Sequence, residues 1–318
     1  MTIKDLLSDA REALSRKGTA SLDAEVLLAF ALGEEREYLV AHSEEEVDDG
    51  NAEVYRKYVE KAASGVPIAY LTHSKEFYGM DFYVDDRVLI PRPETEMVVE
   101  EVLEYFRGSD FACELSKRAG IVDDSISVGK LKLGCGTLLD VGCGSLCITA
   151  AVCHGFDEVY AHALDISEDA LDVARINSEY HDLEGRVEIY QSDLLSSVDE
   201  TEFDVIVANL PYIGEAEFDT AVDEVRDNEP GSALYGEEGS AGGDGLALYK
   251  KMIQEIKHGN IEFNLLVCEF GAKQEKGVKA MLSNFFDQDL DEDGGRKYNW
   301  EIKSDLADIP RIFVVSKR

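Results

Sequence analysis

The stretch that most constrains the fold of this chain is LLDVGCGSLCITA, residues 138–150. A short apolar run of strand length stops at Gly142, and an apolar segment typical of a helix follows from Leu146. Glycine at positions 142 and 144 lets the backbone turn sharply and a ligand approach closely, while the helix start offers unpaired backbone N–H groups. A strand, a glycine turn and a helix predict a ligand cradle, with an ordinary tight turn as the alternative.

The spacing around this turn separates two classes of ligand. A dinucleotide-binding turn reads GxGxxG, but the third residue after Gly144 is Cys147, so the third glycine is missing. A second apolar strand, residues 159–164, ends at Asp165. A carboxylate at this place suits a ribose diol because it accepts two hydroxyl hydrogen bonds. A ribose site without a pyrophosphate site indicates S-adenosylmethionine.

A second motif, FDVIVANLPYI at residues 203–213, joins a buried parallel strand to Asn209-Leu210-Pro211-Tyr212 at the end where open α/β sheets bind ligands. An amide or aromatic amine nitrogen is a poor nucleophile because its lone pair is delocalised, so an enzyme must hold it. The Asn209 side-chain oxygen and the Leu210 carbonyl can accept its two hydrogens and leave the lone pair directed at a methyl group. Pro211 restricts the turn and Tyr212 offers a flat packing face. A turn that simply ends the strand is the alternative for this motif alone.

The order LDVGCGS, ALDIS, QSDLL and VANLPYI resembles class I S-adenosylmethionine-dependent methyltransferases that modify a planar nitrogen. The segments LIPRPETE, NEPGSALYG, GGDGLALYKKMI, CEFGAKQ and DLADIPRIFVV resemble, more narrowly, the HemK/PrmC family of release factor glutamine methyltransferases. The resemblance implies S-adenosylmethionine as the methyl donor and the glutamine of the release factor GGQ motif as the acceptor. Two positions depart from the family: Leu146 replaces its usual third glycine, and Leu210 replaces its more common proline. We expect Leu146 to crowd the methionine end of the donor.

The resemblance also assigns roles to individual positions. The expected donor site contains Asp140, Gly142, Cys143, Gly144, Ser145, Leu146, Asp165, Ile166, Asp193, Leu194 and Asn209. Catalysis is assigned to Asn209, Leu210, Pro211 and Tyr212. Substrate contacts are expected from Arg92, Glu94 and Thr95 and from one aromatic residue of the hairpin, with helix initiation and simple packing as alternatives. The aromatic candidates are Phe77, Tyr78 and Phe82. No metal ligand is expected.

The chain is expected to divide into three parts. Residues 1–66 read as a small helical bundle, which the resemblance makes the substrate-recognition domain. Its first helix carries apolar Leu6, Leu7, Ala10 and Leu14; its second carries Leu22, Val26, Leu27, Phe30 and Ala31, between a Ser21 cap and Gly33. Residues 67–92 are expected to form a linking β-hairpin, with runs at 77–84 and 87–90. Residues 93–318 are expected to form a Rossmann-like α/β domain with a seven-stranded, mostly parallel sheet and an insertion at about 108–136.

Charge and cysteine usage limit the classes of partner and the cell compartment that we expect. The 318 residues include 31 basic and 66 acidic side chains, a formal charge of −35 that repels a phosphate backbone and disfavours nucleic acid as a partner. The six cysteines, at 113, 135, 143, 147, 153 and 268, form no CxxC pair and read as reduced thiols. No apolar run is long enough to span a membrane, so we expect a soluble protein, and the reduced thiols fit the cytoplasm. We also expect a monomer.

Two other functions stay open at this point. The same tetrapeptide chemistry would serve a methyltransferase acting on another planar nitrogen, either a ribosomal-protein glutamine or an adenine amino group, although the latter needs a basic groove. A catalytically silent adaptor that binds S-adenosylmethionine is the other, with Leu146 as its best support.

Overall fold

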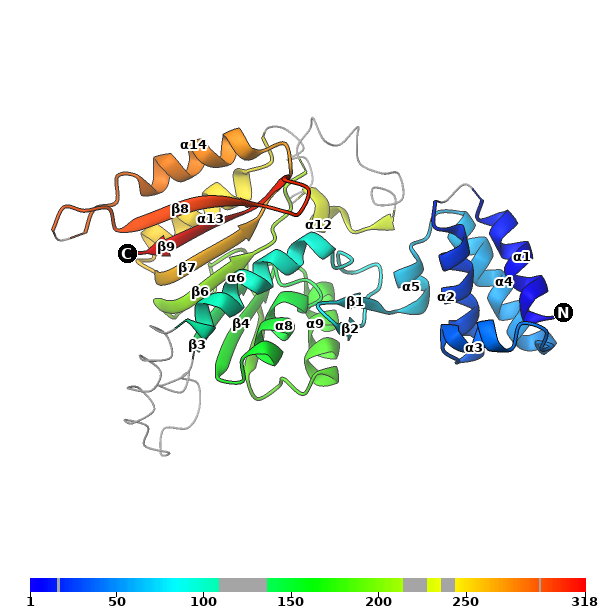
Figure 1. The fold of residues 1–318 in the computed structure, drawn as a ribbon. Helices are drawn as coiled ribbons and strands as arrows, with labels where there is room; N and C mark the ends of the chain where they lie inside the picture. The colour runs from blue at the N-terminus through cyan, green and yellow to red at the C-terminus, as the bar shows by residue number, and fades with distance from the viewer. Residues whose placement is uncertain (16–17, 109–135, 214–227, 236–243, 292) are drawn as a thin grey trace. The chain divides into compact units, whose positions relative to one another are not determined.

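The computed structural model describes residues 1–15, 18–108, 136–213, 228–235, 244–291 and 293–318 (Figure 1). The described residues separate into two compact units. The first comprises Met1–Ser74, Val84–Asp86 and the residues Asn228 and Glu229, and the second comprises the remainder. Each unit has its own buried core and is described by itself.

The first unit is helical. Its helices are α1 Ile3–Ala13, α2 Ala20–Leu32, α3 Arg36–Ala41, α4 Asp49–Ala63 and α5 Ile68–Thr72. A capping box of Thr2 and Asp5 begins α1, because each side chain accepts a hydrogen bond from the other residue's backbone N–H. The expected apolar face of α1 is confirmed, since Leu6, Leu7, Ala10 and Leu14 are all buried.

The second helix differs from the expectation in its start and in its buried face. Helix α2 begins at Ala20, so Ser21 lies inside it and its hydroxyl donates to Glu25 instead of capping the helix. Leu22 and Phe30 are 45% and 42% exposed, and the buried positions are Asp23, Ala24, Leu27, Leu28 and Ala29. The sequence ASLDAEVLLAFAL is apolar around most of its circumference, so its periodicity did not define one face. The left-handed Gly33 ends the helix as expected.

The second unit is built on a seven-stranded sheet. In chain order its strands are β3 Gly136–Val141, β4 Val159–Asp165, β5 Val187–Gln191, β6 Glu202–Ala208, β7 Glu262–Glu269, β8 Tyr298–Ser304 and β9 Pro310–Lys317. Their order in the sheet is β5-β4-β3-β6-β7-β9-β8. Strands β3 to β7 pair in parallel, whereas β9 runs antiparallel to both β7 and β8. The expected seven-stranded, mostly parallel sheet is confirmed.

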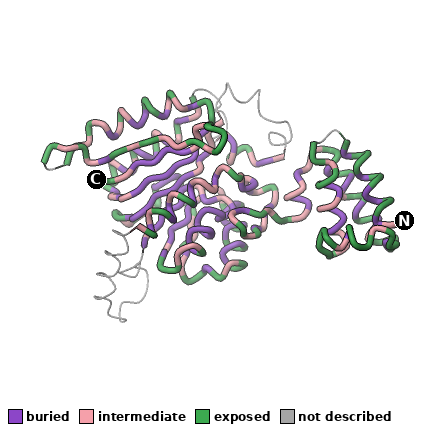
Figure 2. Tube along the Cα trace, in the orientation of Figure 1, coloured by how far each residue is buried: buried purple, intermediate pink, exposed green. Residues whose placement is uncertain are grey.

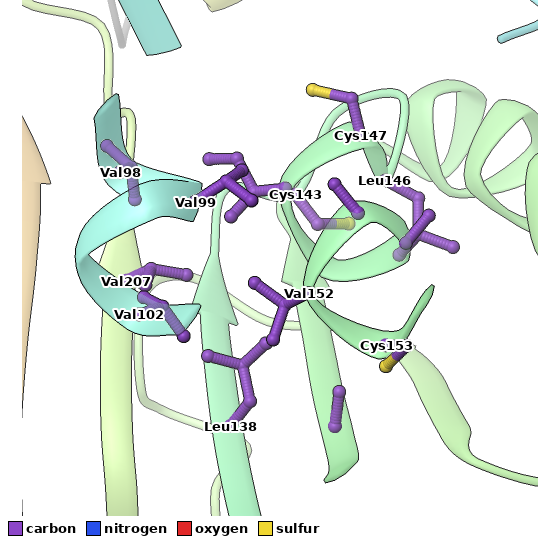
Figure 3. Packing of buried hydrophobic residues seen from close by; sticks show 14 of the residues in the cluster. Val98, Val99, Val102, Leu138, Cys143, Leu146, Cys147, Val152, Cys153 and Val207 are labelled. Carbon is purple, nitrogen blue, oxygen red and sulfur yellow. The ribbon is translucent and has the colours of Figure 1, made fainter. Parts of the chain in front are cut away.

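Helices cover both faces of this sheet, because neighbouring strand residues point to opposite sides. Leu138 packs in a buried cluster with residues of α6 Glu96–Arg107, α8 Cys147–Gly155 and α9 Glu168–Tyr180. The next residue, Leu139, packs in a second cluster with residues of α13 Ala247–His258 and α14 Glu275–Phe286. Figure 2 shows the buried residues concentrated along the strands, and Figure 3 shows part of the first cluster.

The segment before α6 also differs from the expectation. Its hairpin is shorter, with β1 Lys75–Phe77 pairing antiparallel with β2 Met80–Phe82, and residues 87–90 form no strand. Helix α5 occupies part of the expected 67–92 linker. The 3-10 turn η1 Pro93–Thr95 leads into α6, as proline at a first helical position predicts. The expected insertion falls almost entirely outside the described residues. Within the described ranges, no helix combines the length and apolar content needed to cross a membrane.

Candidate active site

A cavity of about 960 Å³ lies in the second unit, and its wall includes the carboxyl ends of β3, β4 and β6. Strand β3 lies between β4 and β6 in the sheet, although β6 follows β5 in the chain. The order of the strands therefore reverses at β3, and such reversal points are where open α/β sheets bind ligands. The short helix α12 Gly231–Tyr235 and the first turn of α13 complete the wall.

The glycine turn after β3 forms one side of this cavity. Gly142 and Gly144 have φ values of 77° and 51°, in the left-handed region that favours glycine. A Cβ on Gly142 would lie 3.1 Å from the Leu210 side chain, so the turn packs directly against the tetrapeptide loop. A Cβ on Gly144 would meet no protein atom within 4 Å. The second glycine therefore leaves space for a ligand.

Asp165, at the end of β4, faces the same turn. Its carboxylate accepts hydrogen bonds from the backbone N–H groups of Gly144, at 3.0 Å, and Ser167, at 2.9 Å. Each carboxylate oxygen keeps a further lone-pair site, which suits the two hydroxyls of a ribose. Removal from water raises the pKa of the Asp165 carboxyl, and these N–H groups oppose the rise. The donor set thus fits the ribose of S-adenosylmethionine.

Leu146 does not crowd the cavity. Its backbone has φ of 71°, which explains why glycine is usual there, but its side chain is fully buried in the cluster shown in Figure 3. Leu146 is absent from the cavity wall, whereas Cys143 and Ser145 on either side of Gly144 belong to it. The expected steric conflict with the donor is therefore corrected: the leucine points into the core.

The tetrapeptide after β6 meets the cavity through Asn209, Leu210 and Pro211. The Asn209 side-chain NH2 donates to the Thr95 hydroxyl at 3.3 Å, and Thr95 donates to the Glu269 carboxylate at 2.6 Å. Tyr212 is not part of the wall. Its hydroxyl donates to the other oxygen of Glu269 at 3.0 Å. Burial and the Glu269 carboxylate raise the pKa of Tyr212, so this hydroxyl stays protonated.

A buried tyrosine holds the backbone of Leu210. The Leu210 N–H donates to the Tyr249 hydroxyl at 3.1 Å, a hydrogen bond that a proline at this position could not make. The same hydroxyl lies within reach of two carbonyl oxygens, that of Leu210 at 3.2 Å and that of Glu269, which forms the shorter contact. The loop that lacks the family's proline is thus tied to α13 by hydrogen bonding.

The segment after β5 contributes Ser192, Asp193 and Leu194 to the wall. The Asp193 carboxylate is held by the Lys251 ammonium group, with N–O distances of 2.8 and 2.9 Å. Lys251 itself lines the cavity from α13. The carboxylate expected at the adenine is therefore paired with a cation from another element.

Several expected site residues lie elsewhere. Phe77 and Phe82 are each 1% exposed and pack against one another with ring centroids 6.1 Å apart, so they anchor the hairpin in the core and do not line the cavity. Glu94 pairs with Arg311 at 3.3 Å, outside the wall, while Arg92 and Thr95 belong to it.

Asp140 lies behind the turn, fully buried, where it accepts a hydrogen bond from the Thr149 hydroxyl at 2.7 Å. Ile166 lies in the wall.

Other wall residues were not identified from the sequence as site residues: Arg87, Val88, Leu89, Pro91, Val141, Cys147, Ile148, Leu164, Ser167, Ala170, Ser192, Gly231, Ser232, Ala233, Tyr235, Ala247, Leu248 and Lys251. The signal for some of them was present. The segments LIPRPETE, NEPGSALYG and GGDGLALYKKMI contain several of these positions, but no role followed from their composition.

Two thiols line the cavity without reactive character. Burial raises the pKa of the Cys147 thiol to about 12 and that of Cys143 well above its ordinary value, so both are protonated at neutral pH. Cys153 and Cys268 are also buried and free, and Cys113 and Cys135 lie outside the described residues. In the part of the chain that the structure describes, no cluster of histidine, cysteine, aspartate or glutamate could hold a metal ion.

The parallel sheet, the glycine turn and the acid at the end of β4 define a class I S-adenosylmethionine-dependent methyltransferase fold. A family model for the PrmC N-terminal domain matches residues 5–72, and one for the methyltransferase small domain matches residues 128–225. The chain is 32% identical over 320 residues to the release factor glutamine methyltransferase of Koribacter versatilis, covering 100% of this chain and 99% of that protein. The Bacillus subtilis protein of the same name is 35% identical over 287 residues, covering 90% of each chain. The chain belongs to the release factor glutamine methyltransferase family.

Proposed function

We propose that this protein transfers a methyl group from S-adenosylmethionine to the side-chain amide nitrogen of the glutamine in the GGQ motif of a peptide chain release factor. The observation that carries the proposal is the contact between the glycine turn 142–144 and the loop 209–212 after β6. A Cβ at Gly142 would lie 3.1 Å from Leu210. A methyl group held at the turn therefore faces an amide held by the loop. The relatives of this chain carry the matching name.

The residues that hold the glutamine amide are Asn209 and Leu210. The Asn209 side-chain oxygen accepts one amide hydrogen, and the Leu210 carbonyl accepts the other. Both hydrogen bonds lie in the amide plane, so the nitrogen lone pair stands perpendicular to them and is directed at the donor side of the cavity. Pro211 limits the conformations of the loop. Such positioning can lower a barrier by ~7–11 kcal/mol in ideal cases, so no general base is required.

When bound, S-adenosylmethionine supplies an electrophilic methyl group on its sulfonium. We assign its ribose to Asp165 and its adenine to the Asp193 and Leu194 segment, with the glycine turn beside its methionine portion. The wall residues Cys143, Ser145 and Ile166 complete this proposed donor site. Asp140 is fully buried, so it would support the donor site from behind the glycine turn. After transfer, the surplus proton on the methylated nitrogen leaves to water.

The remaining parts of the chain are assigned by the same reasoning. We propose residues 1–66 as the domain that recognises the release factor, residues 67–92 as the link, and residues 93–318 as the methyltransferase domain. Release factors act on the ribosome, which places the proposed reaction in the cytoplasm. We propose that the enzyme acts as a monomer.

The test is mass spectrometry of a purified release factor after incubation with this protein and isotopically labelled S-adenosylmethionine. We expect one added methyl group on the peptide that contains the GGQ loop, and none on a release factor whose loop glutamine is replaced by alanine. Methylation of the alanine variant would contradict the assigned acceptor. If no methyl is gained while calorimetry shows donor binding, another nitrogen substrate or the adaptor function replaces the proposal.

Two variants separate the roles within the site. Asn209→Ala should abolish turnover and leave donor binding nearly intact, because the variant loses the acceptor that holds the glutamine amide. Asp165→Ala should instead weaken donor binding, because the ribose loses its acceptor. Unchanged turnover in the first variant, or unchanged donor affinity in the second, would remove the corresponding assignment.

A further inference from the structure

Asn209 can serve as an acceptor only if its side-chain amide is oriented with the oxygen toward the substrate. An asparagine amide has nearly the same shape in both orientations, so its neighbours must select one. In this structure the NH2 group donates to the Thr95 hydroxyl at 3.3 Å. The carbonyl oxygen of Asn209 is thereby left for the substrate.

The orientation of the Asn209 amide depends on whether the Thr95 hydroxyl donates or accepts the hydrogen bond between them. Its hydroxyl has one hydrogen, which is donated to the Glu269 carboxylate at 2.6 Å. The hydroxyl oxygen can then only accept from Asn209, so the asparagine must present its NH2 group. Thr95 and Glu269 are each 2% exposed, so both groups are almost completely shielded from water.

We propose that Glu269 is a positioning residue, which acts through Thr95 to turn the Asn209 side-chain oxygen toward the glutamine amide. This inference rests on the proposed function and extends it to a residue outside the cavity wall. The ionised carboxylate is an acceptor only, so it fixes the direction of both hydrogen bonds in the chain. A protonated Glu269 is a donor to Thr95, whose own hydrogen then lacks an acceptor unless the Asn209 amide reverses. The reversed amide presents NH2 to the substrate and cannot hold its nitrogen.

Some groups around Glu269 favour its protonated form, and others favour its ionised form. Burial raises the pKa of the Glu269 carboxyl, and the nearby Glu94 carboxylate adds to the rise. Hydrogen bonds from Thr95 and Tyr212, and the positive charge of Arg311, oppose it. The Tyr212 hydroxyl donates to the second carboxylate oxygen of Glu269, while the Tyr249 hydroxyl donates to the backbone carbonyl of Glu269. The carboxylate therefore titrates at a higher pH than an exposed glutamate, and the active orientation should be lost as the pH falls.

The test compares Thr95→Val with Thr95→Ser in the full-length protein. Valine keeps the shape of threonine and removes the hydroxyl, whereas serine keeps the hydroxyl. The kcat of each protein is measured against pH with donor and release factor saturating. We expect wild-type kcat to fall as the pH is lowered, and Thr95→Ser to show the same fall. We expect Thr95→Val to have a kcat about 10–100-fold lower near pH 8, with no acid fall, because its amide is no longer coupled to Glu269. Wild-type kcat in Thr95→Val, or an unchanged acid fall, overturns the proposal.

A second measurement does not need turnover. The side-chain NH2 resonances of Asn209 can be identified in a nitrogen–proton correlation spectrum by their loss in Asn209→Asp. We expect their chemical shifts to follow an acid titration in the wild type and in Thr95→Ser, and to be independent of pH in Thr95→Val. A titration that persists in Thr95→Val, or that is missing from the wild type, overturns the proposal. If the wild type shows the titration but methylates no release factor, the proposed substrate fails and the positioning role stands.

Discussion

The α-carbon of Gly245 lies so close to the carbonyl oxygen of Tyr212 that a Cβ on the glycine would stand 2.2 Å from that oxygen. The same Cβ would lie 2.3 Å from the Gln274 amide nitrogen, which donates to the Tyr212 carbonyl at 2.7 Å and to the Asp244 carbonyl at 2.9 Å. Gly245 also has φ of 70°. The turn before α13 therefore holds the end of the loop 209–212 in place.

Gly245→Ala should lower both stability and turnover. Left-handed strain alone costs about 1–3 kcal/mol, and the clash with the Tyr212 backbone must in addition displace the loop. Gly294→Ala is the matched control, because Gly294 has φ of 79° but no atom within 4 Å of the added Cβ. We expect urea unfolding to show the strain cost in both variants, and release factor methylation to fall only in Gly245→Ala. Equal methylation by the two variants would show that this contact does not matter for the reaction.

Tyr249→Phe removes the hydroxyl that accepts from the Leu210 N–H at 3.1 Å. Tyr249 is completely buried, so this N–H loses its partner without gaining water, at a cost of about 1–3 kcal/mol. We expect a matching loss in the free energy of unfolding and a fall in kcat, since the Leu210 carbonyl belongs to the same peptide loop. Tyr298→Phe is a suitable comparison, because Tyr298 packs in the same cluster but lies on β8, three strands away from β6 in the sheet. Full kcat in Tyr249→Phe would contradict the role given to this hydrogen bond.

Leu146 combines a favourable side chain with an unfavourable backbone. Its φ of 71° costs about 1–2 kcal/mol for a residue with a Cβ, while truncating a buried leucine side chain costs more, about 2–5 kcal/mol. Leu146→Gly should therefore destabilise the protein although it restores the family's glycine. Leu146→Ala should be less stable than Leu146→Gly, the reverse of the usual order in helices. Urea unfolding of the three proteins tests this order, and an alanine variant more stable than the glycine variant would refute it.

Asp140 should make stability depend on pH. Burial raises the pKa of Asp140 from 3.8 to about 7. The folded state then holds a proton that the unfolded state releases, so the contribution to stability is complete below about pH 4 and is lost as the pH rises through 7. Between pH 5 and 7 the loss is about 2–3 kcal/mol.

The measurement is the free energy of unfolding of the wild type and of Asp140→Asn at pH 5 and pH 8. We expect the variant to gain on the wild type as the pH rises, because asparagine has no proton to lose. Asp305→Asn serves as control: hydrogen bonding by Arg311 lowers the pKa of Asp305, so its effect should be constant across this pH interval. A difference between wild type and Asp140→Asn that does not change with pH would contradict the shifted pKa.

Local sequence was sufficient for the parallel strands and for much of the cavity. The runs ending at Gly142, Asp165 and Asn209 are apolar enough to be buried on both faces, so their type and their carboxyl ends could be predicted. Glycine, acid and asparagine at those ends are each common in ordinary turns, and their combination at three strand ends favoured a ligand site. These positions meet because parallel strands end at one edge of the sheet.

Contacts between distant elements could not be predicted in the same way. Thr95 and Asn209 meet only because η1 and the end of β6 both pack near β7, and nothing in PRPETE indicates that partner. The direction of the Leu146 side chain depends on its φ, which the residue type does not favour. Phe77 and Phe82 are aromatic residues in a short hairpin, a pattern equally compatible with a binding wall and with the core they form.

The hydrogen bond between Thr95 and Glu269 joins positions 174 residues apart in the chain. During synthesis the glycine turn, Asp165 and Asn209 all leave the ribosome before Glu269 does. A nascent chain that stops short of β7 already contains every residue assigned to the donor, but it lacks Glu269, which would select the orientation of the asparagine amide. Under the proposed mechanism, the group that orients the acceptor asparagine is therefore the last part of the site to be synthesised.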